Sequence, residues 1–275
     1  MKRWPRALLQ AGRNYIHHQS ANQAGSVAFS SLLAMFPLLL LAAATAAYIG
    51  KPGEAGALAR RILALAPGLV QDVLHPVVDQ VLSQRNQALL AVGLLATLWA
   101  ASSGMQSVRT ALNRAYGVEQ GLPFWLARIK VTAFTVVVGT VVVAAFSTVV
   151  AMPYVWQLLR GTLGIAAEVA WLRQSVRYTS AFGVLTLLYA VTYAWLPDRH
   201  QRLARIVPGA LLGAAAWVAA AAVLSYTWQS AGKLALIYGG FAGMVATLVF
   251  LYVSAVTVIF GAEFNAALAA GRGAP

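Results

Sequence analysis

The sequence predicts an all-α integral membrane protein with six transmembrane helices in one bundle, and three observations carry that prediction. Of the 275 residues, 60% are hydrophobic and 10% are charged, whereas a soluble domain carries about 25% charged residues. With histidine taken as neutral, six uncharged runs reach 20 residues or more; they are 14–50, 86–108, 131–159, 178–197, 206–232 and 234–262. About 20 apolar residues suffice for a helix to cross a hydrocarbon core about 30 Å thick. We therefore interpret residues 1–275 as a single polytopic membrane domain.

The distribution of basic residues predicts that the N- and C-termini are both cytoplasmic. The net charge is +13, and the cytoplasmic loops of membrane proteins are enriched in lysine and arginine. With the N-terminus inside, 12 of the 20 basic residues fall in inside segments and eight in outside segments. An even number of spans then returns the C-terminus to the cytoplasmic side.

The first 50 residues predict an interfacial helix followed by the first span. Residues 3–19 have an amphipathic pattern with Trp4 and Tyr15 near one face, which is typical of a helix lying at the membrane surface. The first span covers about 24–49, with Pro37 near its middle. Because proline removes a backbone hydrogen bond and tends to bend a helix, we expect a kink or hinge there.

The segment 51–86 is the longest polar connection of the chain. It carries two helical hydrophobic patterns separated by Pro67 and Gly68, and these predict amphipathic helices in the first extracytoplasmic loop. Their apolar faces either pack on the bundle or the lipid surface, or dock an envelope protein partner.

Five further spans follow this loop. We place them at about 87–104, 131–153, 178–196, 206–226 and 237–264. The helical pattern of the second span continues to Tyr116, so that Arg109 and Asn113 lie beyond the membrane.

Two glycine patterns of the GxxxG type occur in the last two spans. Glycines at this spacing let two helix backbones approach closely in lipid, so we assign Gly209 and Gly213 to helix packing, either within the monomer or at a dimer face. The other three glycines, Gly239, Gly240 and Gly243, lie at the start of the sixth span and are predicted to form a mobile point.

An inner polar cluster is predicted around Glu263. Charged residues at membrane depth usually point to function, and Glu263 is an acid embedded in an apolar stretch near the cytoplasmic end of the sixth span. An unpaired carboxylate there is costly, so we expect Arg109 or Arg114 as its partner. Together with Asn113 and Asn265, these residues form either a structural clamp or a gating or ion-coupled site.

The sequence predicts no enzyme, because it offers no convergent set of reactive groups. Cysteine is absent, and the four histidines are scattered over both predicted sides of the membrane, so they do not assemble one metal site. Motifs for nucleotide binding and for hydrolases are missing. We therefore predict no catalytic residues, no metal and no cofactor.

The basic surface predicts membrane lipids as partners, with anionic headgroups against the cytoplasmic loops. Nucleic acid is not expected, because no basic segment is interleaved with aromatic residues as single-strand binding requires. The oligomeric state is left open.

Several segments of the chain resemble those of a known family. The segment 28–37, AFSSLLAMFP, resembles a first-helix motif of the YihY/BrkB family of bacterial inner-membrane proteins, and 98–116, LWAASSGMQSVRTALNRAY, resembles its second-helix segment. The start of its fifth helix is similar to 207–211, VPGAL. The two ends of its sixth helix are similar to 237–243, IYGGFAG, and 260–265, FGAEFN. These segments follow the family order over nearly the whole chain.

The resemblance implies a six-helix, multi-pass protein of the bacterial cytoplasmic (inner) membrane. Members of the family were formerly labelled ribonuclease BN, and others are linked to envelope maintenance. The function we predict is transporter-like, as a permease or in lipid export, with an unknown substrate. The alternative is a structural or accessory membrane subunit that docks an envelope partner through residues 51–86.

Overall fold

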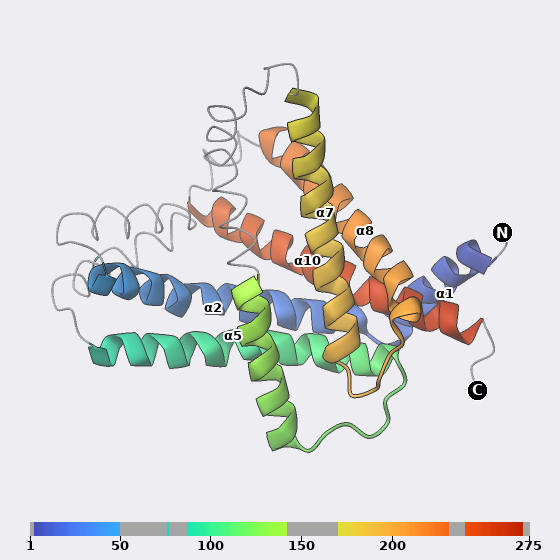
Figure 1. Cartoon of the computed structure of the whole chain (residues 1–275), viewed down its shortest axis with the longest axis horizontal. Helices are drawn as coiled ribbons and strands as arrows, with labels where there is room; N and C mark the ends of the chain where they lie inside the picture. Colours follow the sequence, from blue (N-terminus) through green and yellow to red (C-terminus); the bar gives the residue numbers. More distant parts are fainter. Residues whose placement is uncertain (1–2, 50–75, 77–86, 142–169, 231–239, 272–275) are drawn as a thin grey trace, which may run out of the picture.

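The computed structural model describes residues 3–49, 76, 87–141, 170–230 and 240–271. All regular secondary structure within these residues is helical. The labelled helices are α1 (Arg3–His17), α2 (Ser20–Ile49), α5 (Gln87–Ala115), α7 (Ala170–Trp195), α8 (Leu203–Ser230) and α10 (Gly240–Ala270) (Figure 1). A further helix covers Phe124–Val141. The prediction of an all-α protein is confirmed for this part of the chain.

Three of these helices are long and apolar enough to cross a membrane. They are Phe124–Val141, Leu203–Thr227 and Ala242–Ala270, and they coincide with parts of the third, fifth and sixth predicted spans. Large apolar side chains such as Leu95, Trp99 and Val223 point outwards and are more than half exposed, as expected of a surface that faces lipid. The six-span topology and the cytoplasmic placement of both termini stay predictions.

The observed helices extend beyond the predicted spans. The second predicted span ends at 104 and its helical pattern was predicted to continue to Tyr116, which α5 confirms by running as one helix to Ala115. The helix that begins at Phe124 starts before its predicted span at 131. Helices extend beyond the bilayer because polar residues at their ends still complete backbone hydrogen bonds, so hydropathy marks the membrane-crossing part and not the helix end. The predicted segment 51–86, apart from residue 76, lies outside the described residues.

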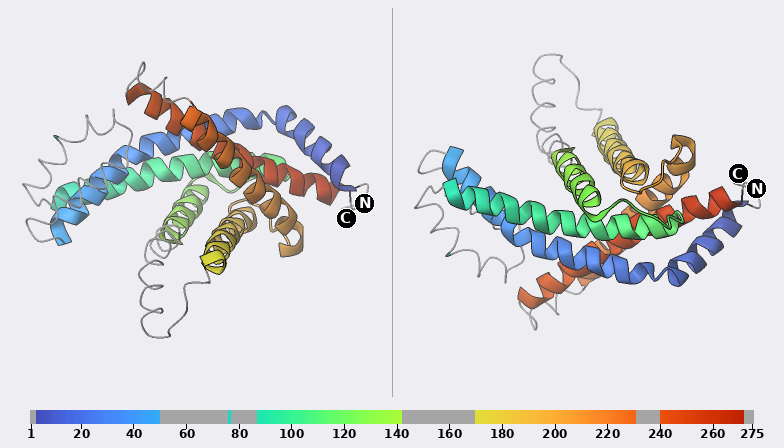
Figure 2. Two further views of the ribbon diagram at one scale, coloured as in Figure 1. Left: turned by 90° about the horizontal axis from the view of Figure 1, so that it is seen from above. Right: turned by 90° about the horizontal axis from the view of Figure 1, so that it is seen from below.

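The helices form an open, layered arrangement. Helices α2 and α5 run antiparallel in extensive contact, and α10 crosses α2 and also packs on α8 (Figures 1 and 2). Helix α7 lies against α8, and α1 lies against the last turns of α10. The described chain therefore begins and ends at the same extremity of the molecule, where N and C lie close together (Figure 1).

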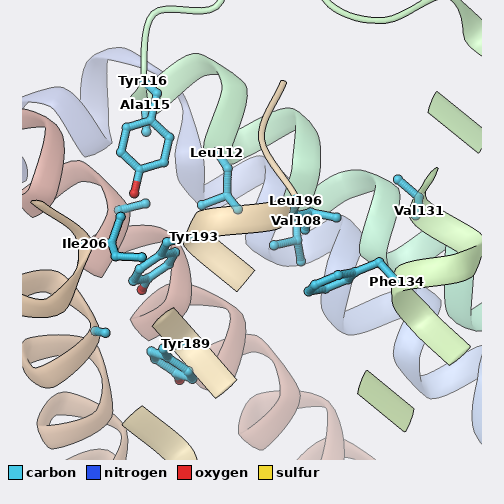
Figure 3. Packing of buried hydrophobic residues seen from close by; sticks show 12 residues of the cluster. Val108, Leu112, Ala115, Tyr116, Val131, Phe134, Tyr189, Tyr193, Leu196 and Ile206 are labelled. Carbon is cyan, nitrogen blue, oxygen red and sulfur yellow. The ribbon is translucent and has the colours of Figure 1, made fainter. Parts of the chain in front are cut away.

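Among the described residues, a buried cluster joins α5, α7, α8, α10 and the helix that begins at Phe124 (Figure 3). Tyr193 is fully buried at its centre, and its hydroxyl donates a hydrogen bond of 2.7 Å to the carbonyl oxygen of Val258 on α10. The hydroxyls of Tyr189 and Thr257 lie 2.9 Å apart in a second hydrogen bond. A buried tyrosine hydroxyl needs such a partner, and these two tyrosines therefore fix the rotation of α7 relative to α10.

Helices α8 and α10 approach each other through glycine. A Cβ atom added to Gly209 would collide with the carbonyl oxygen of Gly261 and with the side chain of Asn265, and one added to Gly213 would lie 2.8 Å from the Tyr189 ring. The absence of side chains at these positions lets the two backbones meet, which is the physical use of small residues at helix crossings in lipid. In the described chain, Gly209 thus lies at a helix contact within the monomer.

Candidate functional site

Two buried carboxylates lie at the end of the molecule that holds both termini. Asp198 belongs to the connection between α7 and α8, and Glu263 belongs to the C-terminal third of α10. The side chain of Asp198 is 3% exposed and that of Glu263 is fully buried. Burying a carboxylate costs free energy unless donors compensate its charge, so the donors around each acid indicate what it does.

Asp198 is surrounded by hydrogen-bond donors from three segments of the chain, which are α5, the loop after it and the helix that begins at Phe124. Arg109 of α5 donates from Nε to Oδ1 over 3.2 Å and from Nη2 to Oδ2, which makes a bidentate ion pair. Asn113 Nδ2 and the backbone N–H of Leu122 donate to Oδ2 over 3.0 Å and 3.2 Å. Lys130 Nζ donates to Oδ1 over 3.1 Å. Both carboxylate oxygens are thus satisfied.

The pKa of the Asp198 carboxyl reflects this set of donors. Burial by itself raises the pKa, but the hydrogen bonds from Arg109, the Leu122 N–H, Lys130 and Asn113 outweigh burial and lower the pKa from 3.8 to about 2. Donors that stabilise only the charged form have this effect. Asp198 is therefore an anion at any physiological pH.

The backbone around Asp198 is shaped to admit these contacts. The Asp198 N–H donates to Asn113 Oδ1 over 2.9 Å, so the Asn113 amide bonds the aspartate through both of its ends. A Cβ atom at Gly121 would lie 3.0 Å from Asp198 Oδ2 and 3.4 Å from Arg109 Nη2. A glycine is needed there because the loop passes directly over the ion pair.

Glu263 makes a different set of contacts. Its Oε1 lies 2.8 Å from His18 Nδ1 in a hydrogen bond and accepts a second, of 3.3 Å, from the hydroxyl of Ser20. Its Oε2 has no hydrogen-bond partner among the described residues, and the same is true of the buried hydroxyl of Tyr15. Glu263 therefore retains an unused acceptor in a fully buried position.

The turn between α1 and α2 brings His18 and Ser20 to Glu263. Gln19 adopts φ of 53°, a left-handed conformation that is uncommon for a residue other than glycine. The chain changes direction across His18 and Gln19, so that the side chains of His18 and Ser20, on either side of Gln19, both reach Glu263. The N–H of Gln19 donates to the carbonyl oxygen of Ile16 over 3.0 Å, which closes the turn.

The predicted partner of Glu263 was wrong. Arg109 binds Asp198, and Arg114 donates to the backbone oxygen of His18 over 3.4 Å. Hydropathy placed Arg109 and Glu263 toward the cytoplasmic ends of their helices, and that depth stays a prediction. The side of the helix to which each side chain points depends on helix packing. Arg109 faces the α7–α8 connection, and Glu263 faces α1 and α2.

Asn265 lies between α10 and α8 and not beside Glu263. Its Oδ1 accepts a hydrogen bond of 2.7 Å from the Gly209 N–H, and its Nδ2 donates to the carbonyl oxygen of Ile206 over 3.0 Å. Pro208 lies inside α8 at this point and has no N–H of its own. Asn265 therefore bonds backbone groups on both sides of the proline, and the predicted polar cluster is divided into three separate contacts.

The predicted hinge residues are placed only in part. Pro37 lies within α2, although its side chain is outside the described part of the chain, and Gly239 is outside it altogether. Gly240 is the first residue of α10, and the carbonyl oxygen of Gly243 accepts a hydrogen bond of 2.9 Å from Thr247. A hinge at these positions stays a prediction.

Four contributing residues were not identified from the sequence: Asp198, Lys130, His18 and Ser20. One signal was available for Asp198, because it is an acid in a short loop, 198–205, that carries three arginines. A lone acid in such surroundings tends to be paired. No pattern in the sequence marked the other three, because their role depends on the turn at Gln19 and on the crossing of α5 with the following helix.

The described residues do not bring together three or more histidine, aspartate or glutamate side chains that could hold a metal ion. At this end of the molecule, both oxygens of Asp198 accept hydrogen bonds, whereas one oxygen of Glu263 has no hydrogen-bond partner among the described residues. The first arrangement fastens segments together, and the second is suited to receiving a proton or a cation.

Comparison with known proteins gives a consistent family relationship. The family model described as "Virulence factor BrkB" matches residues 11–275. The "Putative ribonuclease-like protein YfkH" of Bacillus subtilis is 25% identical over 256 residues, which cover 92% of each chain. A UPF0761 membrane protein of Aromatoleum aromaticum is 26% identical over 247 residues, which cover 89% of this chain and 59% of that protein.

A second UPF0761 membrane protein, from Azoarcus sp., is 26% identical over 250 residues and is likewise covered over 59% of its length. The chain thus spans nearly the whole Bacillus protein but little more than half of these UPF0761 proteins. No solved structure matches the chain.

Proposed function

From the premise that the chain belongs to the BrkB virulence-factor family of membrane proteins, we propose that it is a transporter-like, multi-pass protein of the bacterial cytoplasmic membrane. In this proposal it moves a solute or a lipid by rearranging helices and catalyses no covalent reaction. Glu263 and His18 are the residues that respond to a proton or cation whose movement is coupled to that of the solute or lipid.

The observation that carries the proposal is the environment of Glu263. An acid that is fully buried in a helix long and apolar enough to cross a membrane is expensive to keep, and such residues are usually retained for ion or substrate pathways. One of its two oxygens has no hydrogen-bond partner among the described residues, which is unfavourable for a purely structural clamp.

His18 provides a connection between this acid and water. Its side chain is 27% exposed, whereas Glu263 is fully buried. A proton that reaches the imidazole from the aqueous side is therefore within one hydrogen bond, of 2.8 Å, of the carboxylate. Protonation of the pair changes the charge at the contact of α1, α2 and α10, and such a change is able to bias the packing of these helices.

The reading as a non-enzyme is supported by the state of the other buried acid. Asp198 has a pKa of about 2 because burial, which raises it, is outweighed by four hydrogen-bond donors, so it is not available as a proton acceptor at neutral pH. The ribonuclease-like name belongs to the Bacillus relative, and the described residues offer no group of acids that resembles a two-metal nuclease site.

Reconstitution into liposomes tests the proposal. The full chain is assayed with a panel of ion-flux dyes and labelled lipids, as wild type and as Glu263→Gln, and the matched control is Glu119→Gln at an exposed loop position. We expect flux of at least one substrate in the wild type and in the control, and a loss of at least tenfold in Glu263→Gln.

Fold is monitored in parallel by thermal unfolding, and His18→Gln provides a second variant that leaves the buried acid in place. If the wild type shows no flux of any ion or lipid in the panel, transport is contradicted and the accessory role through residues 51–86 is favoured. Equal flux in the wild type and in Glu263→Gln contradicts the role of Glu263.

A further inference from the structure

A cavity of about 520 Å³ is lined by Arg199, which follows Asp198 in the sequence, and by Asn265, two residues after Glu263. The proposed function gives this cavity no role. It is bounded by α1, the end of α5, the α7–α8 connection and the last turns of α10. Its volume falls within the range of about 300–1,000 Å³ that is usual for small-ligand sites. We call it the arginine pocket, because Arg199, Arg202 and Arg205 line it.

The lining is strongly cationic. His200 adds a fourth basic side chain, and no aspartate or glutamate is among the lining residues. Arg202 and Arg205 form no side-chain hydrogen bond or ion pair with any residue of the described chain. The nearest acid in sequence, Asp198, is already paired with Arg109 and Lys130. The positive charge of the pocket is thus not neutralised by the described protein.

The remaining walls leave room for a ligand and offer it further donors. Alanines of α10 line the cavity, and so do Gln10 and Asn14 of α1, whose side chains form a hydrogen bond of 2.9 Å from Gln10 Nε2 to Asn14 Oδ1. Arg199 is oriented by a hydrogen bond of 3.2 Å from its Nη1 to the carbonyl oxygen of Tyr116. An oxyanion accepts hydrogen bonds and donates none, so guanidinium and amide donors around a small-residue wall match its chemistry.

We propose that the arginine pocket binds a phosphate group. Arginine side chains bind phosphate oxygens bidentately and more specifically than lysine does, and three arginines line this one cavity. The phosphate belongs either to the headgroup of an anionic phospholipid or to a free phosphate compound. This inference does not depend on transport, since it concerns equilibrium binding at a site that does not include Glu263 or His18.

The position of α1 relates the pocket to the membrane surface. Leu9 and Ile16 project from α1 with 70% and 78% exposure, while Gln10 and Asn14 of the same helix face the pocket. An amphipathic helix with this division lies in the plane of the interface. Basic pockets at that depth on the cytoplasmic side are typical sites for anionic headgroups, which is the occupant that the lipid arm of the test examines.

Binding to the purified full chain in detergent tests the proposal. Three probes are titrated calorimetrically: inorganic phosphate, short-chain phosphatidylglycerol and short-chain phosphatidylcholine. The pocket variant is Arg202→Gln combined with Arg205→Gln. Its control, Arg6→Gln combined with Arg13→Gln, removes the same charge from α1 outside the pocket.

We expect phosphatidylglycerol or inorganic phosphate to bind the wild type, the pocket variant to raise Kd at least tenfold, and the control to raise it less than threefold. Binding of phosphatidylglycerol alone assigns the site to lipid, and binding of inorganic phosphate assigns it to free phosphate compounds. Arg202→Lys combined with Arg205→Lys keeps the charge but removes the guanidinium forks, so its Kd is expected to lie between those of the wild type and the pocket variant.

Equal affinity in the pocket variant and the control overturns the proposal, because attraction then comes from the general surface charge. Absence of binding by both anionic probes overturns it as well. Neither result bears on flux through the membrane, and a silent flux panel leaves the calorimetric titration unaffected, so the failures of the two proposals are distinguishable.

Discussion

Asp198 and Glu263 are both buried acids at the same end of the bundle, but their surroundings are opposite. Asp198 receives donors from Arg109, Asn113, Lys130 and the Leu122 backbone, and both of its oxygens are satisfied. Glu263 is more deeply buried and has one oxygen engaged by His18 and Ser20, while the other finds no partner among the described residues.

The difference separates a fastener from a responsive site. A carboxylate with two cations and two neutral donors is held in its charged form and ties together segments that are distant in sequence. A carboxylate with one partly exposed histidine as its partner and one unused oxygen is suited to a change of protonation state. Four substitutions or conditions test this comparison, from the largest expected effect to the smallest.

Replacing Asp198 is expected to have the largest effect on stability. Asp198→Asn leaves Arg109 and Lys130 without their counter-charge, and breaking a buried ion pair in this way costs about 3–5 kcal/mol. Unfolding in detergent by heat or by added sodium dodecyl sulfate measures the loss. Glu119→Gln, at an exposed position, serves as control and should change stability little; a similar small change in Asp198→Asn contradicts the role of Asp198 as a fastener.

Filling the α8–α10 contact is expected to rank second. In Gly209→Ala the new methyl group meets the Gly261 carbonyl and the Asn265 side chain, and overpacking of this kind costs about 1–3 kcal/mol; we expect the upper part of this range. The control is Gly183→Ala on α7, where an added Cβ meets nothing within 4 Å. If both alanine variants unfold at the same temperature, the two helices do not depend on this close approach.

Acid should reveal Asp198 through the pH dependence of stability. Its folded-state pKa is about 2 against 3.8 for the ordinary carboxyl, because hydrogen bonds outweigh the effect of burial. The contribution is complete above about pH 4 and is lost as the pH falls through 2, and it amounts to about 2 kcal/mol. Between pH 5 and 2, the free energy of unfolding should fall less in Lys130→Gln than in the wild type, because one donor to Asp198 is missing. If it falls equally in both proteins, the ion pair is not the cause of the pH dependence.

Replacing Glu263 is expected to have the smallest effect on stability. Glu263→Gln keeps the shape and retains an oxygen for His18 and Ser20, and its amide nitrogen takes the place of an oxygen that makes no hydrogen bond to the described residues. We expect a change of less than about 1 kcal/mol, measured by the same unfolding assay. A loss as large as that of Asp198→Asn removes the contrast between the two acids.

The sequence predicted the positions of the helices well, because charge interruption and hydrophobic run length depend on local composition. The amphipathic start of the chain was predicted over 3–19 and is observed as α1, and α8 and α10 overlap the fifth and sixth predicted spans. Glu263 stood out for the same reason, as an acid inside an apolar run.

The partners of Glu263 were beyond the reach of the sequence. Which face of α10 meets which neighbour depends on the crossing at Gly209 and Gly261 and on the turn at Gln19. Neither changes the hydrophobic pattern that predicted the spans. Arg109 and Glu263 were predicted to lie close enough to pair. Because of the helix crossing, Arg109 instead contacts Asp198, and Glu263 contacts His18.

The turn at Gln19 has a mechanical consequence. Because only His18 and Gln19 separate α1 from α2, a displacement of α1 is passed on directly to the start of α2. The tilted ring contacts of Trp4 with Phe264, with centroids 5.6 Å apart, and of Tyr15 with Phe260, 6.3 Å apart, also tie α1 to α10. A movement of the N-terminal helix therefore changes the contacts of α2 and α10 next to the buried Glu263.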